Sequence, residues 1–379
     1  MISVNICSPT LDLAAPWDDL VQRASPNVFM NPAALTVANE IGFARIRVLL
    51  AWDDSAEPRK LVGIWAFQVR RISRLWPALL EALPYNYAFL SSPVVDPAFV
   101  GVVVPAFLSA IRTSPLLPNV INLKSLDAEA TSFDMLVKTL TEQGRAQLRL
   151  SESTRPFATP ELGVKRSGST RKKLRQDWNR LSAAGAVDIV NNGAPDTAEA
   201  FETFLKLEAS GWKGARGTAL LCDAADAAFV RRMVAALAER GSASVALLRV
   251  DGRPIAAQVL MYCGATAYTW KTAFSPDYAK YSPGALLIDK ITDELFSVGR
   301  ITAIDSCSYE GSFMTQLWAG HRKMADLLVD VGPGKSLAFS LEAARQRGYG
   351  YLRWLRDWIR AWSMPAAPKS KKVSFAAHR

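Results

Sequence analysis

Histidine and paired cysteine are what this sequence most clearly lacks. Of its 379 residues only His321 and His378 are histidines, and the four cysteines lie far apart with no Cys-x-x-Cys pair. These spacings disfavour a zinc site and a disulfide framework. A Ser-His-Asp or Cys-His hydrolase is disfavoured too, because His321 alone lies in sequence expected to fold. The sequence therefore predicts chemistry by carboxylates, tyrosine, lysine or backbone amides, without a metal.

Long apolar runs are also missing. No segment offers the roughly 18 uncharged apolar residues that a membrane-spanning helix needs. The N-terminus shows no basic stretch followed by an apolar one, which a secretory signal would require. The sequence therefore predicts a cytoplasmic protein. Half of its residues are hydrophobic, which is enough for the cores of two domains.

Positive charge is concentrated in two segments. The chain carries a net charge of +10, of which residues 165–180 supply +6 and residues 345–379 supply +8. The rest of the chain is therefore slightly acidic. This distribution excludes a generally basic protein and leaves two local basic surfaces to explain.

The C-terminal basic segment is expected to be a helix over residues 336–364, followed by a disordered tail over residues 365–379. Apolar side chains recur at helical spacing opposite a row of arginines: Leu352, Leu355, Ile359 and Trp362 against Arg353, Arg356 and Arg360. Such an amphipathic helix can dock on its own protein, on an acidic partner or peripherally on the inner face of a membrane.

The rest of the chain is predicted to form two α/β (α+β) domains, residues 1–155 and 156–335. The boundary is placed in "STRPFATPELG", which has three turn signals in succession. The hairpin "KLVGIWAFQVRR" in the first half loosely resembles "GRPIAAQVLMYC" in the second. This similarity suggests an internal duplication of one αβ unit.

The second half begins with a basic helix and continues with strands. The helix is expected to have Ser167 or Ser169 as its cap and Gly185 as its end, with an apolar seam at Leu174, Trp178 and Leu181. Three antiparallel strands are predicted over residues 245–250, 255–263 and 267–274, with an Asp-Gly turn between the first two. A helix and a fourth strand, within "RITAIDSCS", follow.

The helix after the third strand starts abruptly at Ser282, Pro283 and Gly284. Unpaired backbone amides and the helix dipole make such an end attractive to an anion, and glycine would let a phosphate approach the backbone closely. The alternative is an ordinary helix start, because serine caps and proline at the first helical position are common.

The order of hairpin, third strand, helix and strand resembles the core of GNAT-type N-acyltransferases. A closer resemblance is to the CelD/BcsL group, which is related to the FemABX transferases. It covers most of the chain and rests on "SGSTRKKLRQDWNRL", "LEASGWKG", "VDGRPIAAQV", "TWKTAFSPDYAKYSPGALL" and the strand ending "AID". This resemblance implies tandem GNAT-like domains, each with a mixed, mainly antiparallel sheet flanked by helices.

The resemblance further implies an acyl-CoA-dependent N-acyltransferase. Its donor would be acyl-CoA such as acetyl-CoA, and its acceptor an amine, for example an amino sugar or a polysaccharide precursor. Two alternatives remain open. One is a FemABX-like transferase that uses an aminoacyl-tRNA, and the other is a non-catalytic, degenerate GNAT-fold component of a polysaccharide pathway.

The resemblance also assigns site residues. The coenzyme A pyrophosphate would lie on the helix start, with Ser282, Gly284, Ala285 and Leu286, and the acyl arm would enter between the flanking strands. Where the family has Tyr-Lys before a Trp, this sequence has Phe313 and Met314. His321, Arg322 or Lys323 could replace that lysine, and loss of activity is the alternative.

Catalytic candidates follow from the chemistry of an amine attacking a thioester. Asp305 is a candidate to accept the amine proton, or else caps the turn that follows it. Tyr309 or Tyr281 could donate a proton to the thiolate, or else each packs. A covalent mechanism through Cys307 is disfavoured, because no histidine neighbours it in sequence.

Binding candidates are basic or aromatic. Lys271 could pair with a phosphate or with Asp305, or be an exposed strand lysine. Trp212 in a loop, and Trp270, could form an acceptor wall or anchor the core. The basic helix could use Arg171, Lys172 and Arg175 to contact the cofactor 3′-phosphate, an anionic acceptor or RNA, or could present a solvated face.

Overall fold

The computed structural model describes residues 1–165 and 167–363, with side chains to residue 350. The expected disordered tail lies outside the described residues. The expected C-terminal helix is observed as α11 (Leu337–Ser363), and its early side chains Phe339 and Ala343 are buried against the sheet. The apolar stripe from Leu352 onward lies beyond the described side chains. No helix in the described ranges has the length and apolar character needed to cross a membrane.

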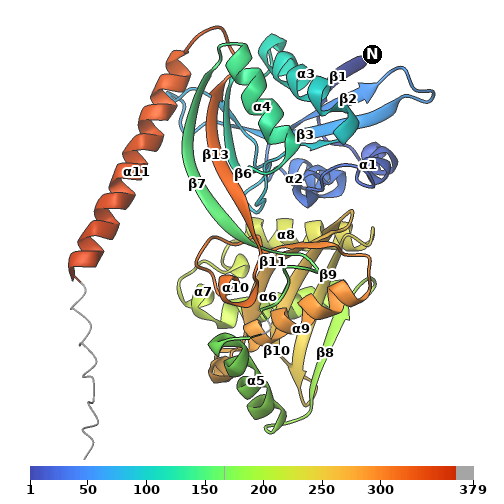
Figure 1. Cartoon of the computed structure of the whole chain (residues 1–379), viewed down its shortest axis with the longest axis vertical. Helices are drawn as coiled ribbons and strands as arrows, with labels where there is room; N and C mark the ends of the chain where they lie inside the picture. Colours follow the sequence, from blue (N-terminus) through green and yellow to red (C-terminus); the bar gives the residue numbers. More distant parts are fainter. Residues whose placement is uncertain (166, 364–379) are drawn as a thin grey trace, which may run out of the picture.

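One mixed sheet of thirteen strands runs through the molecule (Figure 1). The strands of the first half are β1 (Ile2–Cys7), β2 (Ile46–Asp53), β3 (Lys60–Arg70), β4 (Leu79–Glu81), β5 (Val94–Val95), β6 (Val120–Asp127) and β7 (Ala146–Ala158). Those of the second half are β8 (Val187–Asn192), β9 (Ala243–Val250), β10 (Arg253–Cys263), β11 (Thr266–Phe274), β12 (Ala303–Asp305) and β13 (His321–Asp330). The predicted strands of the second half are thus confirmed.

The strand order is β1-β2-β3-β4-β6-β13-β7-β12-β11-β10-β9-β8, with β5 paired to β3. Each half ends in a long strand that pairs with a strand of the other half. β13 pairs with β6 of the first half, and β7 pairs with β12 of the second. When the strand order is read inward from each edge, β1 corresponds to β8, β2 to β9, β3 to β10, β4 to β11 and β6 to β12. This correspondence supports the internal duplication. The proposed boundary at residue 155 falls inside β7.

Helices cover both faces of the sheet (Figure 1). Those of the first half are α1 (Ala14–Leu20), α2 (Pro32–Glu40), α3 (Val100–Thr113) and α4 (Thr131–Glu142). Those of the second half are α5 (Ser169–Ser182), α6 (Thr197–Ser210), α7 (Trp212–Ala215), α8 (Ala224–Ala238), α9 (Pro283–Ser297) and α10 (Met314–Leu317). The basic helix α5 begins after Gly168, so the predicted serine cap is wrong. Leu174 and Leu181 of the predicted seam are buried, and Trp178 is half-buried.

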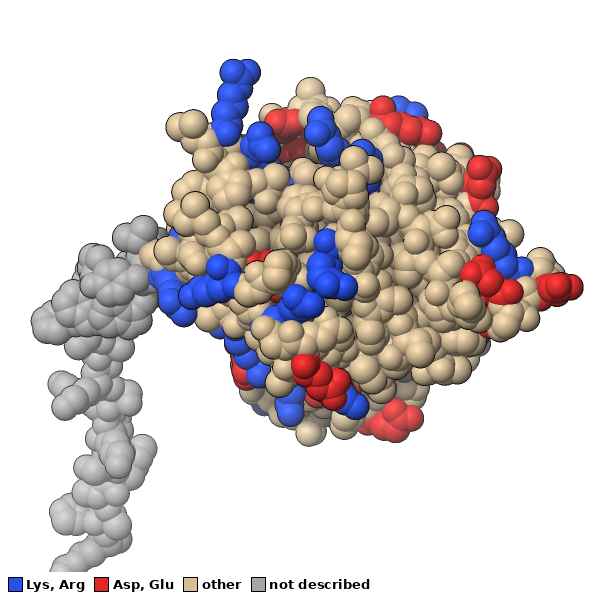
Figure 2. Space-filling model, turned by 90° about the horizontal axis from the view of Figure 1, so that it is seen from above, with Lys and Arg blue, Asp and Glu red and all other residues tan. Residues whose placement is uncertain are grey.

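A continuous core joins the two halves. Phe43 of the first half stacks on Phe229 of α8 with ring centroids 4.1 Å apart. The Tyr268 hydroxyl on β11 donates to the Pro26 carbonyl at 2.8 Å. Burial of these large rings gives the junction the character of a domain interior. Figure 2 shows the outer face over the first half, where charges of both signs are separated by uncharged surface.

Candidate functional site

A cavity opens where two central strands stop pairing. β12 pairs in parallel with β11 only as far as Tyr268 and Asp305, whereas β11 continues to Phe274. Beyond that point lies a cavity of about 560 Å³. We call it the strand-end cavity. It is lined from α5, α7, β11, the start of α9 and the segment after β12: Thr170, Lys173, Leu174, Trp212, Lys213, Thr272, Phe274, Ala279, Ser282, Gly284, Ala285, Phe313, Gln316 and Leu317.

The start of α9 forms one wall of this cavity. Ser282 adopts a left-handed conformation with φ 52°, and its side chain does not cap the helix. Its hydroxyl instead accepts a hydrogen bond from Lys173 Nζ at 2.6 Å. Ala285 N–H is paired with Ser282 O at 3.0 Å, whereas Gly284 N–H has no partner among the described residues. A free amide, the helix dipole and an ammonium group therefore meet at one place, which suits an anion.

Gly284 also has a packing role. A Cβ atom there would lie 3.3 Å from Thr272 Cγ2 and 3.4 Å from Phe274 Cδ1. The glycine thus lets the start of α9 lie close against β11. Ala285 lines the cavity too, whereas Leu286, which the sequence grouped with them, is buried in the core of the second half.

The corresponding helix start in the first half is chemically different. It precedes α3, where Asp96 accepts a hydrogen bond from the Ala98 amide at 3.1 Å and forms an ion pair with Arg23. This carboxylate already satisfies a backbone donor and would repel an anion. Of these two corresponding helix starts, the one before α9 is the one suited to an anionic ligand.

The basic helix α5 contributes a residue that the sequence analysis passed over. Arg171 donates to both oxygens of buried Asp289 at 2.6 and 2.7 Å, so it anchors α5 to α9. Lys173 lines the cavity and pairs with Asp177. Asp177 is buried on the same seam as Leu174. The four-residue spacing of Lys173 and Asp177 is the sequence signal that could have singled out this lysine. Lys172 and Arg175, the other predicted binding residues, are exposed.

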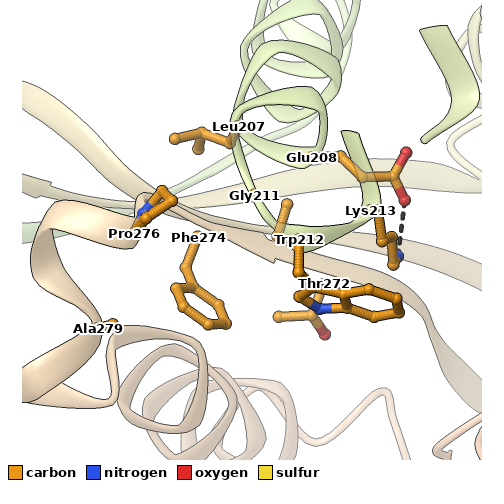
Figure 3. Close-up of a pocket in the computed structure, with 10 residues that line it drawn as sticks. Leu207, Glu208, Gly211, Trp212, Lys213, Thr272, Phe274, Pro276 and Ala279 are labelled. Carbon is orange, nitrogen blue, oxygen red and sulfur yellow. Dashed lines mark hydrogen bonds and ion pairs between the residues drawn. The ribbon is translucent and has the colours of Figure 1, made fainter. Parts of the chain in front are cut away.

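Trp212 lines this cavity and also a second one of about 230 Å³, whose lining residues Figure 3 shows. It lies in the short helix α7, not in the expected loop, and remains 59% exposed. Beside it Lys213 is fixed by an ion pair with Glu208 at 2.7 Å. A Cβ atom at Gly214 would lie 1.7 Å from Ala209 O, so only glycine allows α7 to fold back on α6.

Asp305 does not face the strand-end cavity as a free base. It is fully buried, and its Oδ1 accepts the Cys307 amide at 2.8 Å, so it caps the turn that follows. Arg155 Nη1 lies 3.3 Å from the same oxygen, and Arg322 Nη1 lies 3.1 Å from Oδ2. Both oxygens are therefore occupied, and the structure supports the capping role over the catalytic one.

The two tyrosines proposed as acids have different surroundings. Tyr281 packs beside Tyr278 with Arg180 over its ring at 5.4 Å. Tyr309 is 78% exposed and borders a different cavity. Neither tyrosine lines the strand-end cavity.

Lys271 and Trp270 lie on the other face of β11. The pairing of β10 with β11 skips Trp270, which marks a β-bulge there. Trp270 Nε1 donates to the Tyr87 carbonyl at 3.0 Å, so this buried indole anchors the junction. The Lys271 ammonium lies 5.0 Å from the Tyr87 ring centroid. Neither side chain lines the strand-end cavity, and desolvation lowers the pKa of Lys271 to about 8.

Lys271→Met is expected to stabilise the protein at neutral pH. Because the folded-state pKa is lowered, the unfolded state binds more protons between about pH 8 and 10.5, and stability rises through that window. Below pH 8 the full cost of burying the ammonium is present, roughly 2 kcal/mol after the lost cation–π contact is subtracted. Urea unfolding of both proteins at pH 7 and pH 10 measures this. A gap between them that does not shrink with pH would contradict the assignment.

Of the two positions where the family has Tyr-Lys, only the first lines the strand-end cavity. Phe313 lines the strand-end cavity, whereas Met314 is buried with its sulfur 3.6 Å from the Thr269 hydroxyl. Arg322, considered as a replacement cation, is engaged with Asp305 and with Asp127 at 3.4 Å. His321 and Lys323 are exposed on β13. The cations that line the cavity are instead Lys173 of α5 and Lys213 of α7, and Lys213 is paired with Glu208.

Comparison with known proteins gives the fold of this site. Residues 168–309 match the acetyltransferase (GNAT) domain. The match runs from the start of α5 past the end of β12, so it contains most of the strand-end cavity. No curated protein matches the chain. In the described ranges no group of three His, Cys, Asp or Glu side chains could hold a metal ion.

Solved structures extend the likeness over most of the chain. FemX is 12% identical, with a TM-score of 0.60, 86% of this chain covered and 96% of FemX. The C-terminal domain (DUF2156) of a putative lysylphosphatidylglycerol synthetase from Agrobacterium fabrum is 14% identical, with a TM-score of 0.55, 88% of this chain covered and 96% of that domain. At these identities the likeness shows the fold alone. The fold is α/β, with tandem GNAT-like halves.

Proposed function

We propose that this protein transfers an acyl group from a coenzyme A thioester to an amine. The observation that carries the proposal is the meeting of Lys173, the left-handed Ser282 and the free Gly284 amide in a cavity beside separated strands. The pyrophosphate would bind at this helix start, and the acyl arm would pass between β11 and the segment after β12. Trp212 would cover the arm from the side.

The reaction needs few protein groups. The neutral amine attacks the thioester carbonyl, a C–N bond forms and the C–S bond breaks. The nitrogen loses one proton and the sulfur leaves as a thiolate, which takes up one proton to give the free thiol. The protein's contribution is chiefly orientation and exclusion of water. The acyl group would be acetyl and the acceptor an amino sugar or a polysaccharide precursor, in the cytoplasm. The C-terminal helix would supply any contact with an acidic partner or the inner membrane face.

Calorimetric titration with coenzyme A and acetyl-CoA tests the donor site. The wild type is expected to bind both, and Gly284→Asp to lose binding, because a carboxylate would stand at the helix start. Gly284→Ala is the matched control, since it adds the same Cβ against Thr272 and Phe274 without the charge. Equal losses in both variants would mean that crowding, not charge, removes binding. A wild type that binds neither ligand would refute the proposal.

A second candidate function is aminoacyl transfer from a tRNA. The exposed Lys172 and Arg175 on α5 favour it, because they are placed beside the strand-end cavity and free to contact a nucleic-acid backbone. The fold shared with FemX is compatible with it. Binding of aminoacyl-tRNA should then weaken steeply with salt, and neutralising both residues should lower the slope of log K against log salt by about 2. A slope that the double variant leaves unchanged would count against this donor.

A further inference from the structure

The segment that follows β12 also lines a second cavity. Cys307, Ser308 and Tyr309 line this cavity of about 250 Å³. A few residues further along, Phe313 and Leu317 line the strand-end cavity. One short segment thus contributes to both spaces. The second cavity is completed by the first half of the chain and by β7 and β13: Phe89, Ser125, Ser153, Thr154, Arg155 and Met324.

The backbone around these cavities is strained. Four non-glycine residues among those described have positive φ: Ser125 at 54°, Asp251 at 49°, Ser282 at 52° and Cys307 at 50°. Asp251 belongs to a hairpin turn. Ser125 and Cys307 both line the second cavity, and Ser282 lines the first. Such conformations are unfavourable for residues other than glycine and cluster at functional sites.

The lining of the second cavity is rich in hydroxyl groups. Ser125, Ser153, Thr154, Ser308 and Tyr309 each contribute one. Within the described residues only the Ser308 hydroxyl is paired, with Ser312 at 2.8 Å. We call this space the hydroxyl-lined cavity. Phe89 and Tyr309 add aromatic surface, so the lining offers hydrogen bonds and apolar ring faces together.

The charged residue that lines this cavity, Arg155, is already paired with a carboxylate. Arg155 is buried and donates to Asp305 at 3.3 Å and to the Phe89 carbonyl at 2.7 Å. No other residue that lines the cavity is an acid or a base of permanent charge. The cavity therefore has no carboxylate that would trap an ammonium ion. This favours a neutral amine, which is the form that can attack a carbonyl.

We infer that the hydroxyl-lined cavity is the acceptor site and takes an amine that carries several hydroxyl groups on a compact ring. The inference rests on the proposed function for its reaction, because the two cavities, to which one segment contributes, would hold donor and acceptor. The attacking nitrogen forms the amide C–N bond and the thioester C–S bond breaks. The proton that nitrogen loses passes to water. The thiolate takes its proton from water.

The test uses the full chain, acetyl-CoA and two probe amines, D-glucosamine and cyclohexylamine, which share a six-membered ring and differ in hydroxyl groups. Release of free thiol reports turnover, and calorimetry reports binding of each amine alone. Glucosamine is expected to be acetylated with at least a tenfold higher kcat/KM than cyclohexylamine. Equal rates for the two amines, or no turnover of glucosamine while acetyl-CoA binds, would overturn the inference and leave the proposed function standing.

Ser153→Trp should fill the hydroxyl-lined cavity from an exposed position on β7. It is expected to raise the KM for glucosamine at least tenfold and to leave the affinity for acetyl-CoA unchanged. The matched control is Glu152→Trp, which places the same side chain one residue earlier on β7, lines neither cavity and loses only an exposed ion pair with Arg149. Equal effects of the two variants would overturn the assignment. A wild type that does not bind acetyl-CoA would instead refute the proposed function. Calorimetry with glucosamine alone would then still test whether this cavity binds a hydroxylated ring amine.

Discussion

Lys173→Glu is expected to weaken coenzyme A binding at least 100-fold, which corresponds to about 2.7 kcal/mol. The wild-type ammonium donates to the Ser282 hydroxyl at 2.6 Å and lines the strand-end cavity. The variant removes this cation and places a carboxylate beside the start of α9, opposite buried Asp177. An incoming pyrophosphate would then meet repulsion where the wild type offers attraction. Calorimetry at one fixed salt concentration measures the change.

Lys172→Glu is the matched control for that experiment. It changes the net charge of the protein by the same amount on the neighbouring position of α5, but its side chain is exposed and does not line the cavity. We expect coenzyme A binding to change less than threefold. Equal losses in both variants would show that long-range charge, not a seated phosphate, governs binding, and would favour the tRNA donor.

Asp305→Asn is expected to destabilise the protein by about 3–5 kcal/mol. The variant leaves the positive charges of two arginines next to a buried side chain that no longer carries the compensating negative charge. Arg155 and Arg322 face each other across β7 and β13, and both donate to this carboxylate. The Cys307 amide also loses a charged acceptor. Chemical unfolding of the wild type and variant measures the loss.

Asp127→Asn should cost less. Burial raises the pKa of Asp127, and the attraction of Arg322 offsets this only in part, so its charge contributes less to the folded state. In that variant Arg322 also retains its ion pair with Asp305. A larger loss for Asp127→Asn than for Asp305→Asn would contradict this ranking. The comparison matters for function, since loss of turnover in Asp305→Asn would otherwise be mistaken for loss of a catalytic base.

Strand and helix periodicity predicted much of the second half. The alternating runs around the Asp-Gly turn and the abrupt start at Pro283 are local signals, and the structure places strands and a helix there. The same local chemistry predicted an anion seat at Ser282 and Gly284, which stays a prediction although both residues line the strand-end cavity. The strands and the helix start are set by residues close in sequence, which is why one sequence sufficed for them.

Side-chain direction and long-range pairing could not be read in the same way. A single bulge at Trp270 turns Lys271 to the face opposite Gly284, and nothing in the sequence marks that bulge. Asp305 is paired with Arg155, which lies 150 positions earlier in the chain, and no local pattern announced that partner. The expected domain boundary ignored the pairing of β7 with β12 for the same reason.

Because the last strand of each half pairs with the other half, the order of synthesis affects how the chain folds on the ribosome. The sheet of the first half needs β13, which is made only after residue 320, to cover the edge of β6. Until then β6 presents open backbone groups to any neighbouring strand, a hazard for aggregation. A chain truncated after residue 310 should therefore leave its N-terminal half unprotected against proteases, although every residue of that half is present. Completion of the last strand closes both halves in a single step.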